Sequence, residues 1–145
     1  MKKLLLMLLM AVSIGSFAQL RKIPAVVTDA FKQKYPQAAE VEWKDKITVF
    51  MASFLEDGVK YEARFNKRGT WQQTENETNE ASLPSEVKDG LEKSKYADWE
   101  TTAFYLISLP DDNTQYRITV KKSDLQKKNL LFNNEGKLLK DNITL

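Results

Sequence analysis

The chain has 145 residues, of which 42% are hydrophobic and 29% are charged. This length and composition fit one globular domain, or two very small ones, and exclude disordered and collagen-like classes. The sequence contains no histidine and no cysteine, which removes the commonest general base, thiol nucleophiles, the usual soft metal ligands and disulfide bonds. We therefore expect a protein that is not an enzyme and that holds no metal ion or cofactor.

The first 18 residues have the three parts of a secretory signal peptide. Two lysines open the chain, an apolar run extends from Leu4 to Val12, and Ala18 supplies a small residue at the cleavage site. The apolar run is shorter than the roughly 20 residues that a membrane-spanning helix needs. We expect cleavage after Ala18 and a mature chain, residues 19–145, that is periplasmic or secreted and is not anchored in the membrane.

Cleavage would also change the charge balance. The full chain has 22 basic and 20 acidic residues, and the two lysines of the signal peptide are the only charged residues in its first 18 positions. The mature chain then has 20 residues of each sign and a net charge of zero. A neutral chain has no overall attraction for nucleic acid, so nucleic acid is excluded as an expected partner.

Two segments predict short helices. Residues 23–31 align with residues 83–91, and each segment begins with an apolar residue followed by a proline, Pro24 or Pro84. Proline is tolerated in the first turn of a helix, and apolar residues at helical spacing follow both prolines. Gly90 occupies the position that a small alanine has in the first segment, which predicts a close approach between helix and sheet.

Alternation of apolar and polar residues predicts strands after each helix. The expected strands are residues 39–44, 47–55, 59–66 and 70–75 in the first half and residues 98–108, 115–122, 128–133 and 137–142 in the second. Asp57-Gly58 is a strong signal for a two-residue hairpin turn. Residues 76–82 are polar and lack apolar periodicity, so we expect them to form a linker between the halves.

The turn at Asp57-Gly58 fixes which side chains share a face of the sheet. An even-length hairpin pairs Met51 with Arg64 and Leu55 with Lys60. The core face then contains Phe50, Ala52, Phe54, Tyr61, Ala63 and Phe65. The opposite face, which is the candidate partner-binding surface, contains Ile47, Val49, Met51, Leu55, Lys60, Glu62 and Arg64. This face is unusually apolar for one that meets water; alternatively, the long basic side chains cover its aliphatic residues.

Catalytic patterns are weak in this sequence. Ser85-x-x-Lys88 has the spacing used by serine acylating enzymes, but the companion motifs of those enzymes are missing. Glu40 and Glu42 share a strand face, and an exposed position explains them without any acid-base role. We therefore expect no catalytic residues.

Three features recur in both halves of the chain: a proline-led helix, a tryptophan in the strand that follows it (Trp43 and Trp99), and a Phe-Asn-x-x-Gly turn (residues 65–69 and 132–136). In these features the chain resembles the PepSY-like family of small periplasmic proteins, which is related in fold to β-lactamase inhibitory proteins. The resemblance implies an α+β fold, a tandem repeat of a helix followed by an antiparallel β-meander. The repeats would cover about 23–75 and 83–143, with both helices on one face of a continuous concave antiparallel sheet.

The resemblance implies no known activity, but in the inhibitory relatives the sheet binds a protein. We therefore predict a non-enzymatic exported binding module that holds a periplasmic protein or peptide on its exposed sheet face, with inhibition as one outcome. The alternative is a carrier of a small molecule or an envelope lipid, which would need an apolar cavity. We also leave open a homo-oligomer, in which the partner is a second copy of the chain.

Overall fold

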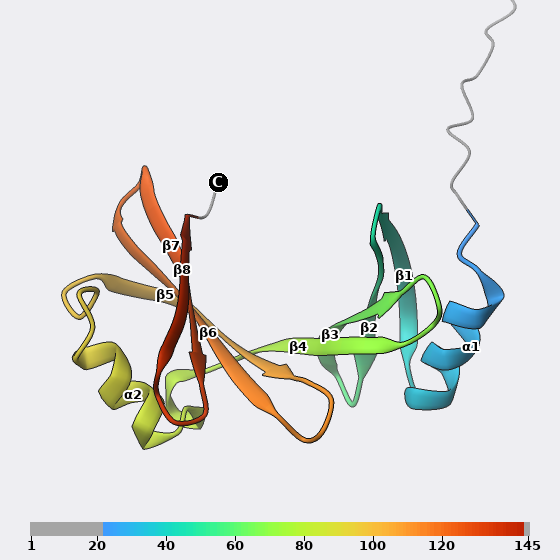
Figure 1. Cartoon of the computed structure of the whole chain (residues 1–145), viewed down its shortest axis with the longest axis horizontal. Helices are drawn as coiled ribbons and strands as arrows, with labels where there is room; N and C mark the ends of the chain where they lie inside the picture. Colours follow the sequence, from blue (N-terminus) through green and yellow to red (C-terminus); the bar gives the residue numbers. More distant parts are fainter. Residues whose placement is uncertain (1–21, 144–145) are drawn as a thin grey trace, which may run out of the picture.

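The computed structural model describes residues 22–143; the predicted signal peptide lies outside them. In chain order the elements are α1 (Ala25–Lys34), β1 (Ala39–Lys46), β2 (Val49–Glu56), β3 (Val59–Asn66), β4 (Trp71–Thr78), the 3₁₀ helix η1 (Glu80–Ser82), α2 (Ser85–Glu92), β5 (Glu100–Ser108), β6 (Thr114–Ser123), β7 (Gln126–Asn133) and β8 (Leu138–Ile143). The strands form one antiparallel sheet in the order β1 to β8 (Figure 1). No helix in residues 22–143 has the length and apolar character needed to span a bilayer.

The predicted fold class, an α+β tandem repeat of a helix and a meander, is wrong. The described residues are mostly a single eight-stranded antiparallel sheet, and the two α-helices have only 10 and 8 residues. The predicted linker does not separate two units, because Asn76 and Thr78 belong to β4 and pair with Leu106 and Phe104 of β5. The hydrogen-bonded ladder therefore continues through the middle of the chain, and the molecule is a sheet carrying two short helices.

Individual strands and turns follow the sequence pattern closely. No predicted strand boundary lies more than three residues from the observed one. Asp57 and Gly58 have φ angles of 51° and 76°, the left-handed values that a type I′ hairpin turn requires. The predicted register of this hairpin is confirmed, since Met51 pairs with Arg64 and Leu55 with Lys60.

The first half of the sheet packs its core against α1. The buried residues are Val27, Phe31, Phe50, Ala52, Phe54, Ala63 and Phe65, and Tyr61 packs against them from a half-buried position. The Phe31 ring lies 5.3 Å from the Trp43 ring and 5.1 Å from the Phe54 ring, both nearly perpendicular. Edge-to-face contacts of this kind add to the free energy gained by burial. The predicted core face of the β2–β3 hairpin is confirmed.

The second half packs a different core against α2. The buried residues are Leu83, Val87, Tyr96, Tyr116, Ile118, Val120, Leu130 and Phe132. Gly90 of α2 makes the predicted close approach, but to a turn between strands: a Cβ atom on Gly90 would lie 2.0 Å from the carbonyl oxygen of Gly136, between β7 and β8. No side chain fits in that space, so Gly90 sets how closely α2 can sit.

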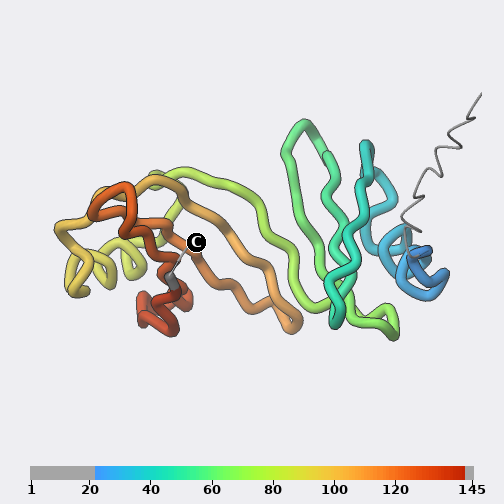
Figure 2. The backbone as a smooth tube through the Cα atoms, turned by 90° about the horizontal axis from the view of Figure 1, so that it is seen from above, coloured from blue at the N-terminus to red at the C-terminus, as the bar shows by residue number. Residues whose placement is uncertain are grey.

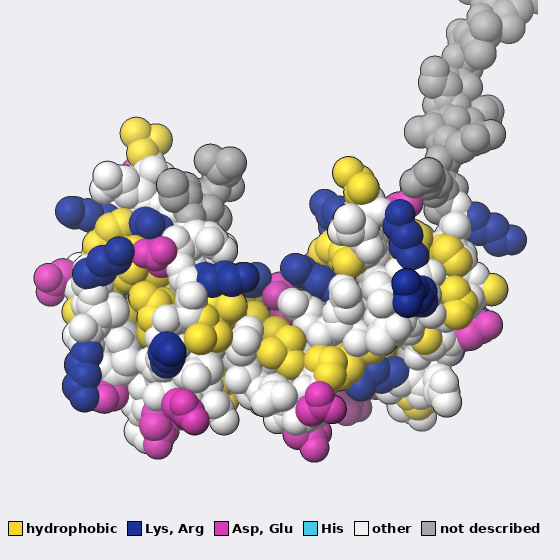
Figure 3. Space-filling model, in the orientation of Figure 1, with side chains coloured by type: hydrophobic (Ala, Val, Ile, Leu, Met, Phe, Trp, Pro, Cys, Tyr) yellow, Lys and Arg dark blue, Asp and Glu magenta, His cyan; other side chains and the backbone are white. Residues whose placement is uncertain are grey.

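Both helices lie on the same face of the sheet. Tyr61 of the α1 core shares a row of paired residues with Asn76, Leu106 and Tyr116, and the last two pack in the α2 core. In Figure 1, α1 and α2 lie at the two outer ends, while β4 and β5 join the halves; the backbone trace in Figure 2 shows the same arrangement from above. Figure 3 shows the surface hollowed between the halves. We call the face without helices the open face.

Candidate functional site: the open face of the sheet

Most of the predicted binding residues lie together on the open face. They come from β2 (Val49, Met51 and Leu55) and from β3 (Lys60, Glu62 and Arg64). Ile47 is the exception, because the turn between β1 and β2 uses residues 47 and 48 and β2 begins only at Val49. Ile47 has a φ of 44° and is 82% exposed, so it stands at the tip of the hairpin.

The aliphatic residues of this face are neither bare nor fully covered. Val49, Met51 and Leu55 are all half-buried. The register places the long side chain of Arg64 beside Met51 and that of Lys60 beside Leu55. Long basic side chains can cover apolar surface with their methylene groups, and the half-buried positions of the three aliphatic residues leave part of this stripe exposed.

The open face also carries an ion pair that joins the two halves. Arg117 of β6 donates two hydrogen bonds to the Glu75 carboxylate of β4, at 3.0 Å and 3.2 Å. The two side chains are only 23% and 12% exposed. The guanidinium carbon of Arg117 lies 4.1 Å from the centre of the Tyr105 ring, on the strand between them. A bidentate pair and a cation–π contact together fix the Arg117 side chain.

A second ion pair lies next to the first. Glu62 is directly opposite Glu75 in the β3–β4 register, an arrangement that repulsion between like charges makes unfavourable by itself. Each glutamate has its own arginine, because Arg64 donates a 3.3 Å hydrogen bond to Glu62. We call Arg64, Glu62, Glu75 and Arg117 the charge row. Across β3, β4 and β6 the two glutamates lie side by side at the centre, and each end is closed by the arginine that neutralises the nearer glutamate.

Two N–H donors of the charge row have no acceptor. Within residues 22–143, the Nε atoms of Arg64 and Arg117 are buried and have no hydrogen-bond partner. A buried donor without an acceptor costs free energy, so both arginines retain an unsatisfied N–H on the open face.

Sequence reasoning missed the part of this site that comes from β4 to β6. Glu75, Tyr105 and Arg117 come together only because β4 pairs with β5. The sequence instead predicts a linker over residues 76–82, which include the end of β4. The available signal was the alternation in β5 and β6, where Tyr105 and Arg117 alternate with the core residues Leu106, Tyr116 and Ile118. That pattern indicates two faces but does not show which strand comes next to β5.

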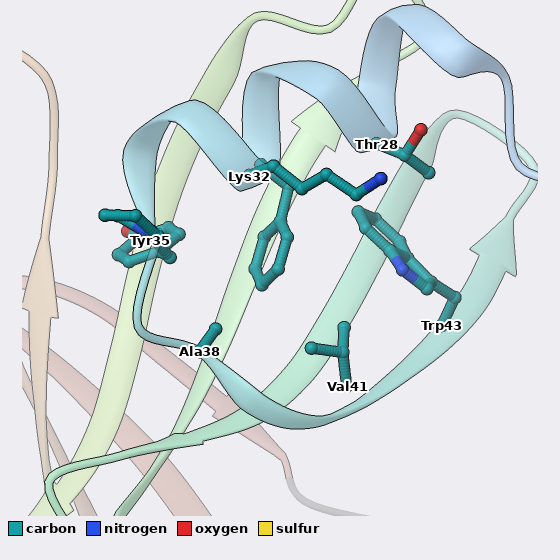
Figure 4. A pocket seen from close by; sticks show the side chains of 8 residues that line it. Thr28, Lys32, Tyr35, Ala38, Val41 and Trp43 are labelled. Carbon is teal, nitrogen blue, oxygen red and sulfur yellow. The ribbon is translucent and has the colours of Figure 1, made fainter.

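A groove lies on the other face, at the edge of the sheet, between α1 and β1 (Figure 4). It has a volume of about 550 Å³ and is lined by Thr28, Phe31, Lys32, Tyr35, Pro36, Ala38, Val41 and Trp43. A β-bulge shapes its floor, because Ala39 pairs with Leu55 whereas Glu42 pairs with Ser53, and the intervening Glu40 has a φ of 51°. Val41 beside the bulge is 38% exposed.

A comparison with protein families matches residues 48–140, more than half of the chain, to the family described as "Putative beta-lactamase-inhibitor-like, PepSY-like". The chain belongs to the PepSY-like family. The resemblance stated from the sequence is therefore confirmed. The match includes β2 to β7 and with them the whole charge row.

Solved structures similar to this PepSY-like chain come from Bacteroides species. A BLIP-like protein from Bacteroides fragilis is 27% identical with a TM-score of 0.71, over 85% of this chain and 87% of that one. A DUF2874 family protein from Bacteroides ovatus is 26% identical with a TM-score of 0.75, over 84% and 88%. A protein from Bacteroides eggerthii, described as periplasmic, is 22% identical with a TM-score of 0.75 over 84% and 89%, which shows the fold. A comparison with curated proteins gave no match.

The remaining sequence candidates in this PepSY-like chain have structural explanations. Ser85 opens α2 in an exposed position, and its hydroxyl donates a 3.1 Å hydrogen bond to the carboxylate of Glu86. Glu40 and Glu42 are exposed on β1. Within residues 22–143, no group of three or more acidic side chains is arranged to hold a metal ion. Among the described residues, the open face is therefore our candidate binding surface, because it combines two ion pairs, a cation–π contact and partly exposed aliphatic side chains.

Proposed function

We propose that this chain is an exported binding module that holds a protein or peptide segment on its open face. Membership of the PepSY-like family supports a non-enzymatic module. The signal peptide predicted from the sequence and the description of the Bacteroides eggerthii neighbour as periplasmic both favour the periplasm as its location. The binding site itself rests on the open face.

The observation that carries the proposal is the combination of the charge row with the half-buried aliphatic stripe beside it. Protein interfaces are enriched in arginine, tyrosine and methionine, and their strongest contacts lie near the centre of the interface, where binding excludes water. Arg117, Tyr105 and Met51 provide these side chains on one face. Because Glu75 and Arg117 hold each other in place, a partner would meet a surface whose side chains need little further ordering.

The carrier alternative is less well supported. A carrier of a small molecule or an envelope lipid needs an enclosed apolar cavity. The groove between α1 and β1 is lined by Lys32 as well as by apolar residues, and Val41 at its floor is 38% exposed. This groove lies at the sheet edge, where solvent enters, so protein binding on the open face is the better proposal.

Photo-crosslinking tests the proposal directly. A photoreactive residue replaces Met51 on the open face in one variant and Val26, an exposed residue of α1, in the matched control. The exported protein is irradiated in the periplasm, and crosslinked products are identified by mass spectrometry. We expect position 51 to capture a defined protein that position 26 does not capture, and Met51→Asp to abolish binding of that protein when both are purified. Identical products from both positions would contradict the proposal.

Inhibition is the narrower form of the same proposal. The BLIP-like description of the Bacteroides fragilis neighbour makes a β-lactamase the first enzyme to assay. If the open face inhibits this enzyme, adding the purified protein slows hydrolysis of a chromogenic β-lactam, and Met51→Asp restores the rate whereas Val26→Asp does not. An unchanged rate at high protein concentration would remove β-lactamase as the target.

A further inference from the structure

The two edges of the sheet differ in the contacts that their side chains make. At the β8 edge, the Asp141 carboxylate accepts a hydrogen bond from the Tyr96 hydroxyl and lies 3.1 Å from the Lys95 ammonium. These contacts hold the Asp141 side chain against the segment after α2. At the β1 edge, six of the eight residues are exposed. An edge strand presents unpaired N–H and C=O groups that can accept another strand, and exposed residues lie along most of β1.

The charges of β1 change sign along the strand. Glu40 and Glu42 come first and Lys44 and Lys46 follow, all four exposed, while the half-buried Asp45 lies between the two lysines and would face Val41 in the pairing described below. Among the ion pairs between described residues, none includes any of these four side chains. Trp43 lies at the centre of this pattern.

This order of charges is complementary to itself when the strand is reversed. If β1 pairs with an antiparallel β1 so that Trp43 faces Trp43, then Glu42 faces Lys44 and Glu40 faces Lys46 on both sides of the centre. Opposite charges directly across a pair of strands stabilise it, and like charges destabilise it. Moving the register by two residues places Lys44 or Glu42 opposite itself, and parallel pairing in register places like charges opposite each other.

We propose that a second copy of this chain pairs with β1 about a two-fold axis through Trp43. The two eight-stranded sheets then form one continuous sheet. Glu42 and Lys44 lie in the regular part of β1, so they determine the register, whereas the bulge places Glu40 at the end of the paired stretch. The partner is identified by the strand itself, because its charge order fits its own reverse.

The groove between α1 and β1 supports the same partner. Antiparallel edge strands that are paired side by side keep their faces in common, so the α1 helices of both copies lie on one face of the joined sheet. The groove, with Val41 and Trp43 at its floor, then opens toward the second copy. Covering its apolar lining removes that surface from water.

Pairing at β1 also limits the assembly to two copies. A two-fold interface uses the same surface on both partners and leaves no second copy of that surface free. The structure therefore favours a closed dimer over a fibre.

Two charge-reversed variants test this inference. The basic-edge variant carries Glu40→Lys and Glu42→Lys, and the acidic-edge variant carries Lys44→Glu and Lys46→Glu. All four residues are exposed, so the melting temperature should change little. In sedimentation velocity, we expect a concentration-dependent wild-type dimer and a dissociation constant at least about tenfold higher for each variant alone. An equimolar mixture should restore the dimer, because positions 40, 42, 44 and 46 are then all basic in one strand and all acidic in the facing strand.

A control separates the strand from overall charge. Lys67→Glu with Arg68→Glu changes the net charge by the same amount as the acidic-edge variant, but in the exposed turn between β3 and β4. This control should dimerise like the wild type. A wild-type protein that is monomeric at every concentration, or a mixture of the two edge variants that stays monomeric, would overturn the proposal. Neither result bears on binding at the open face, where Met51 is the test residue.

Discussion

The two halves of the sheet build similar arrangements from different side chains. In the first half, α1 packs on rings, since Phe31, Phe54 and Trp43 meet edge to face. In the second half, the centre beneath α2 is mostly aliphatic, with Val120 and Leu130 fully buried. A short helix over four antiparallel strands does not require one kind of core. What the halves share must therefore lie outside the core.

The shared feature is a turn that supports the start of each helix. The side-chain oxygen of Asn66 accepts backbone hydrogen bonds from Arg68 and Thr70, at 2.9 Å and 3.0 Å. The equivalent oxygen of Asn133 accepts them from the residues at the same spacing, at 3.2 Å and 2.8 Å. The glycine of each turn lies directly against a helix carbonyl: a Cβ on Gly69 would lie 2.5 Å from the Val26 oxygen, and one on Gly136 would lie 1.9 Å from the Glu86 oxygen. The turns position the helices, and the cores fill the space that remains.

Separating the halves has the largest expected effect. Residues 19–78 and 79–145 expressed separately should be largely unfolded or aggregated, because each piece is small and loses the β4–β5 pairing, which exposes a strand edge. The intact chain should melt in one two-state transition with equal calorimetric and van't Hoff enthalpies. A half that folds with the stability of the whole would contradict this prediction.

Truncating one central side chain in each half compares the aromatic core under α1 with the mostly aliphatic core under α2. Phe54→Ala should lower the free energy of unfolding by about 3–5 kcal/mol and Leu130→Ala by about 2–5 kcal/mol. Phe54 should have the larger effect, because its ring contacts those of Phe31, Tyr35 and Tyr61. Urea unfolding measures both values. A smaller loss for Phe54 than for Leu130 would mean that the aromatic core repacks around the cavity.

The contact between Gly90 and Gly136 should reverse the usual effect of replacing a helix glycine with alanine. Alanine normally stabilises a helix by about 1 kcal/mol relative to glycine. Here a methyl group at position 90 would meet the Gly136 carbonyl oxygen at 2.0 Å, so Gly90→Ala should destabilise the protein by about 1–3 kcal/mol, as overpacking does. Glu92→Ala, at an exposed position of the same helix, serves as the control and should be nearly neutral in thermal melts.

The smallest expected effect depends on pH and concerns the second half alone. The Tyr96 hydroxyl, followed by the Lys95 ammonium, holds the pKa of Asp141 below its ordinary value of 3.8. A lowered pKa in the folded state stabilises the protein above pH 3.8, and this contribution is lost as the pH falls through the folded-state pKa. Asp141→Asn should therefore lower the melting temperature slightly at neutral pH and leave it unchanged in strong acid. Asp29→Asn, at an exposed position of α1, should not reproduce this pH dependence.

The sequence predicts the hairpins far better than the junction between them. The register of β2 and β3 follows from Asp57-Gly58, because a two-residue turn leaves one pairing that keeps all apolar residues on one face. The β4–β5 pairing is not predicted, because Glu75, Asn76 and Glu77 make both faces of β4 polar. Apolar alternation cannot reveal such a strand, which is specified by its partner β5, more than twenty residues later in the chain.

The same limit applies to the site. Six of the seven predicted surface residues lie on the open face, because they belong to the well-specified hairpin. Glu75, Tyr105 and Arg117 could not be added, since their proximity depends on the β4–β5 pairing. Ile47 is expected at the start of the strand from the alternation of apolar and polar residues, but the turn uses it, with a positive φ that a β-branched residue rarely adopts.

The sheet order has a consequence for the time course of folding. Every strand pairs with its neighbours in the chain, and six of the seven pairings are closed by connections of two to five residues. The β4–β5 pairing alone spans residues 79–99, which include α2. Closing a longer loop costs more entropy, and less local contacts form more slowly. In pulsed hydrogen exchange during refolding, the amides shared by β4 and β5 should gain protection last, so the Glu75–Arg117 pair forms only when the rest of the sheet is already in place.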